Sequence, residues 1–153
     1  MDSSTGIRPS IAARVGVRVS DWPQAIREAC EPLVRAGCIS PRYADRCVEL
    51  VRENGPYIVL APGVALAHAR PEDGAVTLAL SAVTLAVPVT FGHPSNDPVD
   101  VVLAFASPDR NAHVGMLAAL ARHLARGLRE RLRTAISNSI AIALLQEVVD
   151  DVD

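Results

Sequence analysis

The chain has 153 residues, half of them hydrophobic but only 3% aromatic, with 17 acidic and 15 basic residues and a net charge of −2. This length and composition fit one domain with an aliphatic core. The near-neutral balance supplies no general field for nucleic acid or anionic lipid, which excludes partners recognised by charge alone, nucleic acid among them.

The amino-terminal residues 1–19 are expected to form an arm or an edge strand, because valines alternate near its end. This segment lacks a basic stretch followed by an apolar one, so we expect no signal peptide and a cytoplasmic location. Residues 20–153 are expected to form a single domain. The spacing of Cys30, Cys38 and Cys47 matches no zinc or redox motif, which favours free thiols.

Two helices are predicted next along the chain. Asp21 is a suitable N-cap for the first, and Gly37 can close it. Ser40 can cap the second helix, which Gly55 ends.

Apolar segments after these helices predict strands over residues 57–60, 64–67, 76–85 and 99–106. The last two are almost wholly apolar, which is typical of strands covered on both faces. The uncharged stretch 74–96 is long enough to span a membrane. Its threonines and Pro88 instead favour two buried strands with a break at Pro88, so we expect no direct membrane insertion.

Asn111 is expected to cap a third helix and Ser137 a final one. The apolar stripe of the third helix is expected at Val114, Leu117, Leu120, Ala121, Leu124 and Leu128. Helices before, between and after buried strands predict a three-layer α/β/α sandwich around a mixed, mostly parallel sheet of about five strands.

His68 follows an apolar run that has no charged residue between Gly55 and Ala67. At the end of a strand, such a ring either caps the strand through a hydrogen bond or belongs to a functional site. Ligands gather at strand ends in α/β sheets, where loops are held by a rigid support. Position alone leaves both interpretations open.

His113 is expected to be the second residue of the helix capped by Asn111. The first-turn N–H groups and the helix dipole favour an anion there. A neutral imidazole can donate from one nitrogen and accept at the other, so it could help to hold a phosphoryl group. The alternative is a surface histidine that only decorates the first turn.

The other two histidines predict no catalysis. His93 lies in a turn-rich loop, which we expect it to order together with Asn96 and Asp97. His123 falls off the apolar stripe and is expected to be solvated. The sequence contains no local histidine pairing for zinc and no nucleotide-binding or serine-hydrolase motif, so no metal or cofactor is expected.

Three segments carry a specific resemblance. They read GPYIVLAPGVALAHARPEDG over 55–74, PVTFGHPSNDPV over 88–99 and ASPDRNAHVGML over 106–117. In this order they resemble the mannitol/fructose-type (type 2) EIIA domains of the bacterial phosphoenolpyruvate:sugar phosphotransferase system (PTS), and are most similar to the ascorbate-specific branch. The resemblance extends from about residue 20 to the carboxyl terminus.

The resemblance implies that His68 takes a phosphoryl group from phospho-HPr and passes it to a cysteine of a cognate EIIB protein, which works with an EIIC permease. It implies that His113 stabilises the phosphoryl oxygens, with Arg70 and Arg52 as further stabilising candidates. The implied sugar is ascorbate or a related sugar acid or pentitol. Such a transfer asks the protein mainly for alignment and charge stabilisation, which needs neither metal nor nucleotide.

One position departs from the family pattern. The family has proline immediately before the reactive histidine, whereas this chain has Ala67. Because proline fixes φ, its loss is expected to loosen the strand end that aims His68. Val64 and Leu66 are expected to offer small apolar contacts to docking partners.

Two other functions remain open from the sequence. One is a regulatory EIIA-like phosphoprotein of the nitrogen type, which acts by binding other proteins. The other is a non-catalytic α/β interaction module in which both histidines are structural. The sequence leaves the oligomeric state undetermined.

Overall fold

A computed structural model describes residues 10–152 of the chain. The strands are β1 (Ser10–Val17), β2 (Val59–Ala61), β3 (Val64–Ala67), β4 (Ala79–Val89) and β5 (Val99–Ala106). The helices are α1 (Trp22–Arg35), α2 (Pro41–Asn54), α3 (Arg110–Ala125), α4 (Leu128–Thr134) and α5 (Asn138–Asp150), with a 3-10 turn, η1 (Pro71–Asp73).

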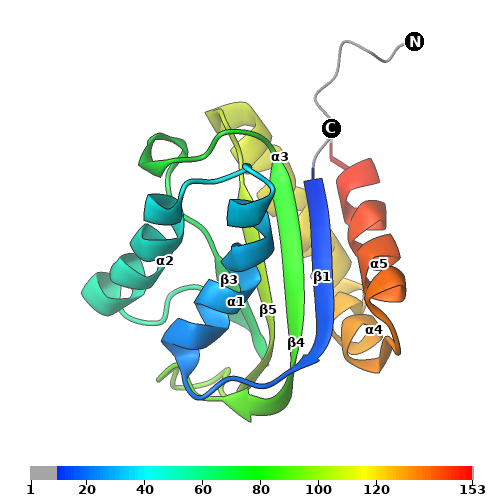
Figure 1. Ribbon diagram of the computed structural model, residues 1–153. Helices are drawn as coiled ribbons and strands as arrows, with labels where there is room; N and C mark the ends of the chain where they lie inside the picture. The colour runs from blue at the N-terminus through cyan, green and yellow to red at the C-terminus, as the bar shows by residue number, and fades with distance from the viewer. Residues whose placement is uncertain (1–9, 153) are drawn as a thin grey trace.

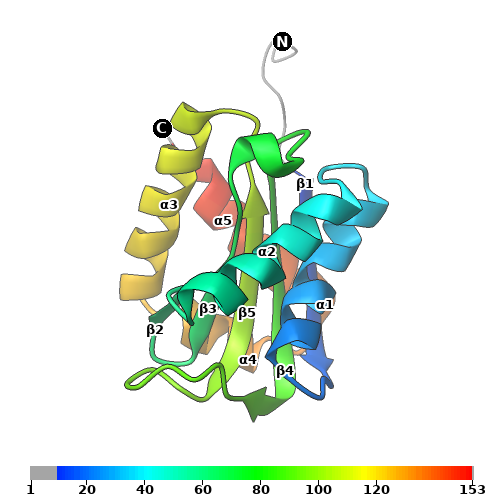
Figure 2. The same ribbon diagram turned by 90° about the vertical axis from the view of Figure 1, so that its left-hand side faces the viewer.

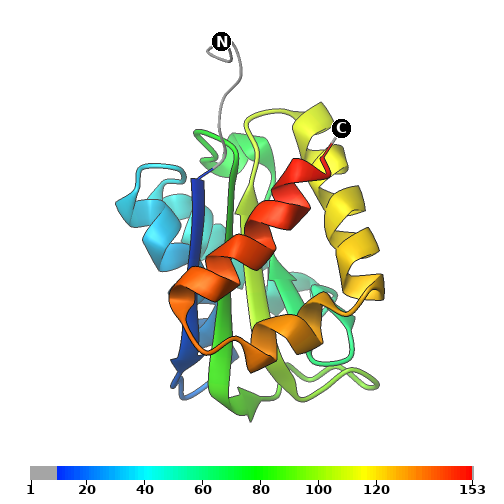
Figure 3. The ribbon, with the colours of Figure 1, turned by 90° about the vertical axis from the view of Figure 1, so that its right-hand side faces the viewer.

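The molecule has three layers. Figure 1 shows α1 and α2 on one side of the sheet and α4 and α5 on the other. Figure 2 looks onto the layer of α1 and α2, and Figure 3 onto the layer of α4 and α5, with α3 standing at its side. Two separate apolar cores fill the spaces between the sheet and these layers. The predicted α/β/α sandwich is therefore confirmed.

The sheet has five strands in the order β1-β4-β5-β3-β2. β1 pairs with β4 and β3 with β5 in parallel, whereas β4 pairs with β5 and β2 with β3 in antiparallel fashion. The sheet is mixed, as predicted, but its parallel and antiparallel pairings are equal in number rather than mostly parallel. The short connections from β2 to β3 and from β4 to β5 explain this, because antiparallel neighbours need no crossover helix. The described part of the predicted arm is edge strand β1, and residues 1–9 lie outside the described residues.

The predicted break at Pro88 is wrong, because β4 continues through Pro88 to Val89. β1 pairs with β4 only as far as Leu85, so the last residues of β4 have no partner in β1. A proline can occupy such an unpaired edge because its missing N–H leaves no ladder bond broken.

Side-chain caps begin α1, α2, α3 and α5, whereas α4 begins after Gly127 without one. Asp21, Ser40 and Ser137 accept backbone N–H groups at the starts of α1, α2 and α5, as predicted. The predicted cap of α3 is wrong: Asp109, not Asn111, accepts the Ala112 N–H at 2.8 Å. Because Asp and Asn cap about equally well, the earlier residue takes the role and adds two residues to the helix.

The apolar stripe of α3 also differs from the prediction. Its buried residues are Met116, Ala119 and Leu120, whereas Val114 is 60% exposed. Since α3 stands at the side of its layer, only part of its apolar surface is covered (Figures 2 and 3). Among residues 10–152, no helix is long and apolar enough to cross a membrane.

Two histidines have structural contacts. Nδ1 of His93 accepts the Asn96 N–H at 3.0 Å, and the Asp97 carboxylate accepts N–H groups of the same loop, which confirms the predicted ordering role. His123 was expected to be solvated, but its side chain is only 11% exposed and its Nε2 lies 2.6 Å from a carboxylate oxygen of Asp151. Asp151 directly follows α5, so this partner comes from another helix end, which no periodicity on α3 could indicate.

Candidate phosphoryl-transfer site

Two imidazole rings from distant parts of the chain meet at one edge of the sheet. His68 directly follows β3, and His113 lies in the second turn of α3, which follows β5. The centroids of the two rings are 5.8 Å apart. β3 and β5 are parallel neighbours, so both leave the sheet at the same edge and bring these rings together.

A backbone hydrogen bond fixes the protonation of His68. Its Nδ1 lies 2.9 Å from the carbonyl oxygen of Leu66. A carbonyl oxygen can only accept, so Nδ1 carries the proton and donates. In the neutral ring the lone pair is therefore on Nε2, which is the nucleophilic atom.

Aromatic rings surround His68. Phe105, at the end of β5, stacks on it at 5.5 Å and also lies 4.9 Å from the His113 ring. Tyr57 presents an edge-on contact at 6.3 Å. These neighbours hold the ring in place and exclude water from most of its surface.

Burial lowers the pKa of both histidines from the ordinary value. For His68 desolvation is the cause, opposed by the hydrogen bond to Leu66. For His113 desolvation comes first and the nearby His68 ring second. Both rings are therefore neutral at pH 7, which leaves the His68 lone pair free.

This shift predicts a pH dependence of stability. An unfolded histidine has a pKa of about 6.5, above that of either buried ring. As the pH falls, the unfolded chain therefore takes up protons before the folded chain does. The free energy of unfolding should have its maximum above pH 6.5 and should decrease as the pH drops from there through the folded pKa values. Urea unfolding between pH 7.5 and 5.5 measures the slope. His68→Asn keeps an N–H donor for Leu66 but cannot gain a charge, so it should have a shallower slope; an equal slope would contradict the assignment.

A cavity of about 380 Å³ opens beside His113. Its lining residues are Arg70, Pro71, Glu72, Pro108, Asp109, Arg110 and His113. Two guanidinium groups and two carboxylates thus share this space with the ring. Arg70 lines this cavity together with His113, and Arg110 is a further cation there that the sequence analysis missed.

Arg52 lies elsewhere. Its Cζ is 5.8 Å from the centroid of the Trp22 ring, which it covers. It belongs to the last turn of α2, whereas the loop after His68 contacts the first turn of that helix through Tyr43. The structure therefore brings together His68, His113 and Arg70 but not Arg52.

The predicted docking contacts at Val64 and Leu66 are wrong, because both side chains are completely buried in β3. β3 lies between β5 and β2, so its side chains face the two helix layers. Tyr57 and Val114 instead supply exposed apolar surface near the rings, at 45% and 60% exposure.

The aromatic residues were also missed. The chain has five aromatic residues in all. Trp22 packs on Phe91, and the other three lie around His68: Tyr57 and Phe105 contact its ring, and Tyr43 bonds to the backbone beside it. Because the chain has so few aromatic residues, their positions in the sequence were the signal that could have indicated the surroundings of His68.

Comparison with known proteins gives consistent results. Residues 8–148 match the family model described as "Phosphoenolpyruvate-dependent sugar phosphotransferase system, EIIA 2". The ascorbate-specific PTS system EIIA component of Salmonella choleraesuis is 35% identical over 153 residues, covering 96% of this chain and 95% of that protein. The solution structure of the mannitol-specific cryptic phosphotransferase enzyme IIA CmtB from Escherichia coli matches with a TM-score of 0.74 and 33% identity, covering 89% of this chain and 90% of that one.

A more distant structure shares the fold alone. It is enzyme IIA of the mannitol system of Escherichia coli, solved in complex with phosphorylated enzyme IIB. The match has a TM-score of 0.73 and 23% identity, and covers 89% of this chain and 94% of that one.

These findings define a phosphotransferase component, a protein that carries a phosphoryl group. The chain belongs to the EIIA type 2 family of the phosphoenolpyruvate-dependent sugar phosphotransferase system.

Proposed function

We propose that this chain carries the phosphoryl group on Nε2 of His68, takes it from phospho-HPr and passes it to a cysteine of a cognate EIIB protein. The observation that carries the proposal is the hydrogen bond from His68 Nδ1 to the Leu66 carbonyl, because it leaves Nε2 unprotonated beside a second imidazole. Similarity to ascorbate-specific components supports ascorbate or a related sugar acid or pentitol as the transported sugar. The relay operates in the cytoplasm.

The chemistry follows from this geometry. The lone pair of Nε2 attacks phosphorus, a P–N bond forms, and the bond from phosphorus to the donor's leaving atom breaks. The Nδ1 proton stays on the ring, where the Leu66 carbonyl stabilises the positive charge that develops on the imidazole. A thiolate of EIIB then attacks phosphorus, so that a P–S bond forms and the P–N bond breaks. The electron pair of the broken bond returns to Nε2 and restores the neutral ring.

His113 stabilises the phosphoryl oxygens. Its Nδ1 is buried and has no hydrogen-bond partner among residues 10–152. A buried N–H without a partner is rarer and costlier than an unpaired acceptor, so the neutral ring holds its proton on Nε2 and can donate it to an anion.

His113→Ala should leave His68 able to accept phosphate but slow the transfer about a hundredfold to a thousandfold, the range for loss of one oriented donor. Labelling rates measured with phosphoenolpyruvate, enzyme I and HPr test this. His123→Ala removes a histidine from the same helix whose ring instead contacts Asp151, so it serves as the matched control. A wild-type rate in His113→Ala would remove His113 from the mechanism.

Arg70 and Arg110 complete the proposed site. Both line the cavity next to His113, where a guanidinium can form charge-assisted hydrogen bonds with phosphoryl oxygens. Glu72 and Asp109 in the same lining balance the charges of these two guanidinium groups. We assign Arg52 no part at the phosphoryl group, because it lies over Trp22.

The relay itself is the test of function. The chain, incubated with phosphoenolpyruvate, enzyme I and HPr, should gain one phosphoryl group on His68 that is stable to alkali and labile to acid, as a P–N bond is. Adding an ascorbate-type EIIB protein should discharge the label. Labelling without discharge to EIIB would favour the regulatory alternative, and failure to label would favour the non-catalytic module.

A further inference from the structure

One buried hydroxyl group joins the two chain segments that carry the site. Tyr43, on the first turn of α2, is only 2% exposed. Its hydroxyl accepts the backbone N–H of Ala69 at 3.0 Å and donates to the carbonyl oxygen of Phe105 at 2.9 Å. The Ala69 carbonyl lies 3.3 Å away as a second, longer acceptor.

Both partners of this hydroxyl are next to the reacting ring. Ala69 directly follows His68, and Phe105 stacks on His68 while also packing on His113. Leu66, on the other side of His68, accepts the proton of its Nδ1. The backbone is thus fixed both before and after His68, and Tyr43 holds the later position.

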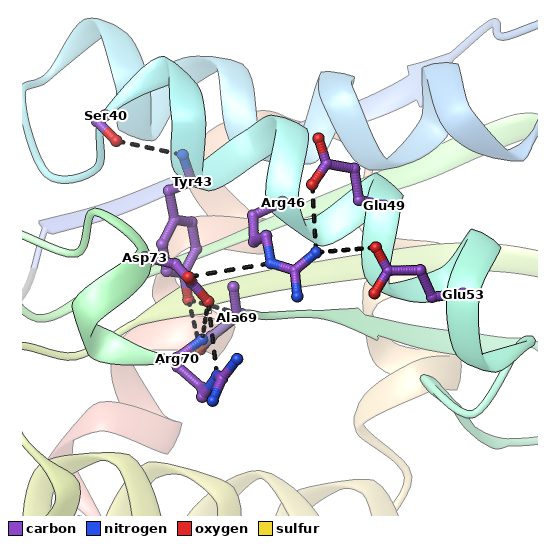
Figure 4. A network of polar contacts seen from close by, with 8 residues as sticks. All are labelled: Ser40, Tyr43, Arg46, Glu49, Glu53, Ala69, Arg70 and Asp73. Atoms are coloured by element: carbon purple, nitrogen blue, oxygen red, sulfur yellow. Dashed lines mark hydrogen bonds and ion pairs between the residues drawn. The ribbon is translucent and has the colours of Figure 1, made fainter.

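α2 is itself attached to the loop after His68. Ser40 donates its N–H to the Gly74 carbonyl at 2.9 Å, and Arg46 Nε lies 3.9 Å from an Asp73 carboxylate oxygen. The other oxygen of that carboxylate accepts the Arg70 N–H at 3.1 Å. Figure 4 shows Tyr43, Arg46, Asp73 and Arg70 together in this network. Tyr43 therefore bonds to the loop from a helix that contacts the same loop at two further points.

We propose that Tyr43 is a positioning residue for phosphoryl transfer, whose hydroxyl sets the direction of His68 Nε2 relative to His113 by bridging Ala69 and Phe105. The inference rests on the proposed function. Tyr43 does not contact the phosphoryl group. Burial raises the pKa of Tyr43 above its ordinary value, so the phenol stays protonated and keeps its donor throughout the working pH range.

The test compares two variants that each lose one buried hydroxyl. Tyr43→Phe removes the bridge. Ser81→Ala removes a hydroxyl that is also completely buried and donates to the Ala29 carbonyl, where β4 meets α1. Tyr43→Phe should lower the single-turnover rate of labelling from saturating phospho-HPr by about tenfold to a hundredfold, since small misplacements of reacting groups cost this much. The KM for phospho-HPr should stay unchanged, and Ser81→Ala should label at the wild-type rate.

A second readout separates positioning from general stability. The ¹⁵N signals of the His68 ring should show a proton on Nδ1 in the wild type and in Ser81→Ala, and a mixture of tautomers in Tyr43→Phe. A wild-type rate and a wild-type ring spectrum in Tyr43→Phe would overturn the positioning role and leave the proposed function intact. Failure of the wild type to label would instead refute the function.

The bridge can also be tested in the unaltered chain, should Tyr43→Phe not fold. The Ala69 amide follows the strand and lies in a loop, yet it should exchange with deuterium as slowly as the amides of β5. Exchange at the rate of exposed loop amides would overturn the proposal whatever the variant does.

Discussion

His68→Ala is expected to abolish phosphoryl labelling completely. The reason is chemical: alanine offers no nitrogen, and none of the surrounding groups can replace Nε2 in the same place. The His113 ring lies 5.8 Å from the His68 ring, but its free Nδ1 is buried and its other nitrogen holds the proton, so it is set to donate rather than to attack. Intact mass after incubation with phosphoenolpyruvate, enzyme I and HPr should show a gain of one phosphoryl group in the wild type and no gain in the variant.

His68→Asn is the matched control for this experiment. Its side-chain amide can still donate to the Leu66 carbonyl, so the loop should keep its shape while the nucleophile is lost. Unlabelled His68→Asn with wild-type stability would show that the loss is chemical. Normal labelling of either variant would mean that another residue carries the phosphoryl group.

Phe105→Ala is expected to have the largest effect on stability. Phe105 is completely buried at the end of β5 and packs on both histidine rings. Removing such a ring costs about 3–5 kcal/mol through lost apolar burial and the cavity left behind. Urea denaturation should measure this decrease in the free energy of unfolding. Labelling should also slow under conditions in which the variant is still folded, because neither imidazole keeps its supporting face.

Leu103→Ala separates these two effects. Leu103 is on the same strand, in the same core and equally buried, but it belongs to none of the ring contacts of the site. Its replacement should cost about 2–5 kcal/mol and leave the labelling rate of the folded fraction unchanged. Equal loss of rate in both variants would show that Phe105 acts only through stability.

Strand bounds and helix caps could be predicted from the sequence where a single strong local signal was present. β3 and β5 have the predicted bounds, and the caps at Asp21, Ser40 and Ser137 are confirmed. Each of these depends on residues within one turn or one strand. Where two signals competed, as at Asp109 and Asn111, local chemistry did not choose between them.

Features set by distant neighbours could not be predicted in the same way. Pro88 ends no strand because β1 stops short beside it, and His123 finds its partner in a segment that follows α5. The exposure of Val114 depends on α3 standing at the side of its layer. In each case the outcome depends on a neighbouring helix or strand. The periodicity of the sequence does not show where that neighbour lies.

The candidate site also combines residues that could be predicted from local motifs with residues that could not. His68 and His113 could be named from motifs, and the parallel pairing of β3 with β5 accounts for their meeting. Tyr43 and Phe105 could not be placed, because their roles come from three-dimensional contacts with the backbone and with rings. The expected loosening at Ala67 is countered by the pairing of that residue with Ala104 inside the sheet.

The bond between His68 and Leu66 also decides how this imidazole meets other electrophiles. A reagent such as diethylpyrocarbonate must acylate an unprotonated nitrogen, and only one is presented here. Carbethoxylation and loading by the donor therefore compete for a single atom. Carbethoxylation measured at His68 itself thus reports the fraction of the carrier that holds no phosphoryl group.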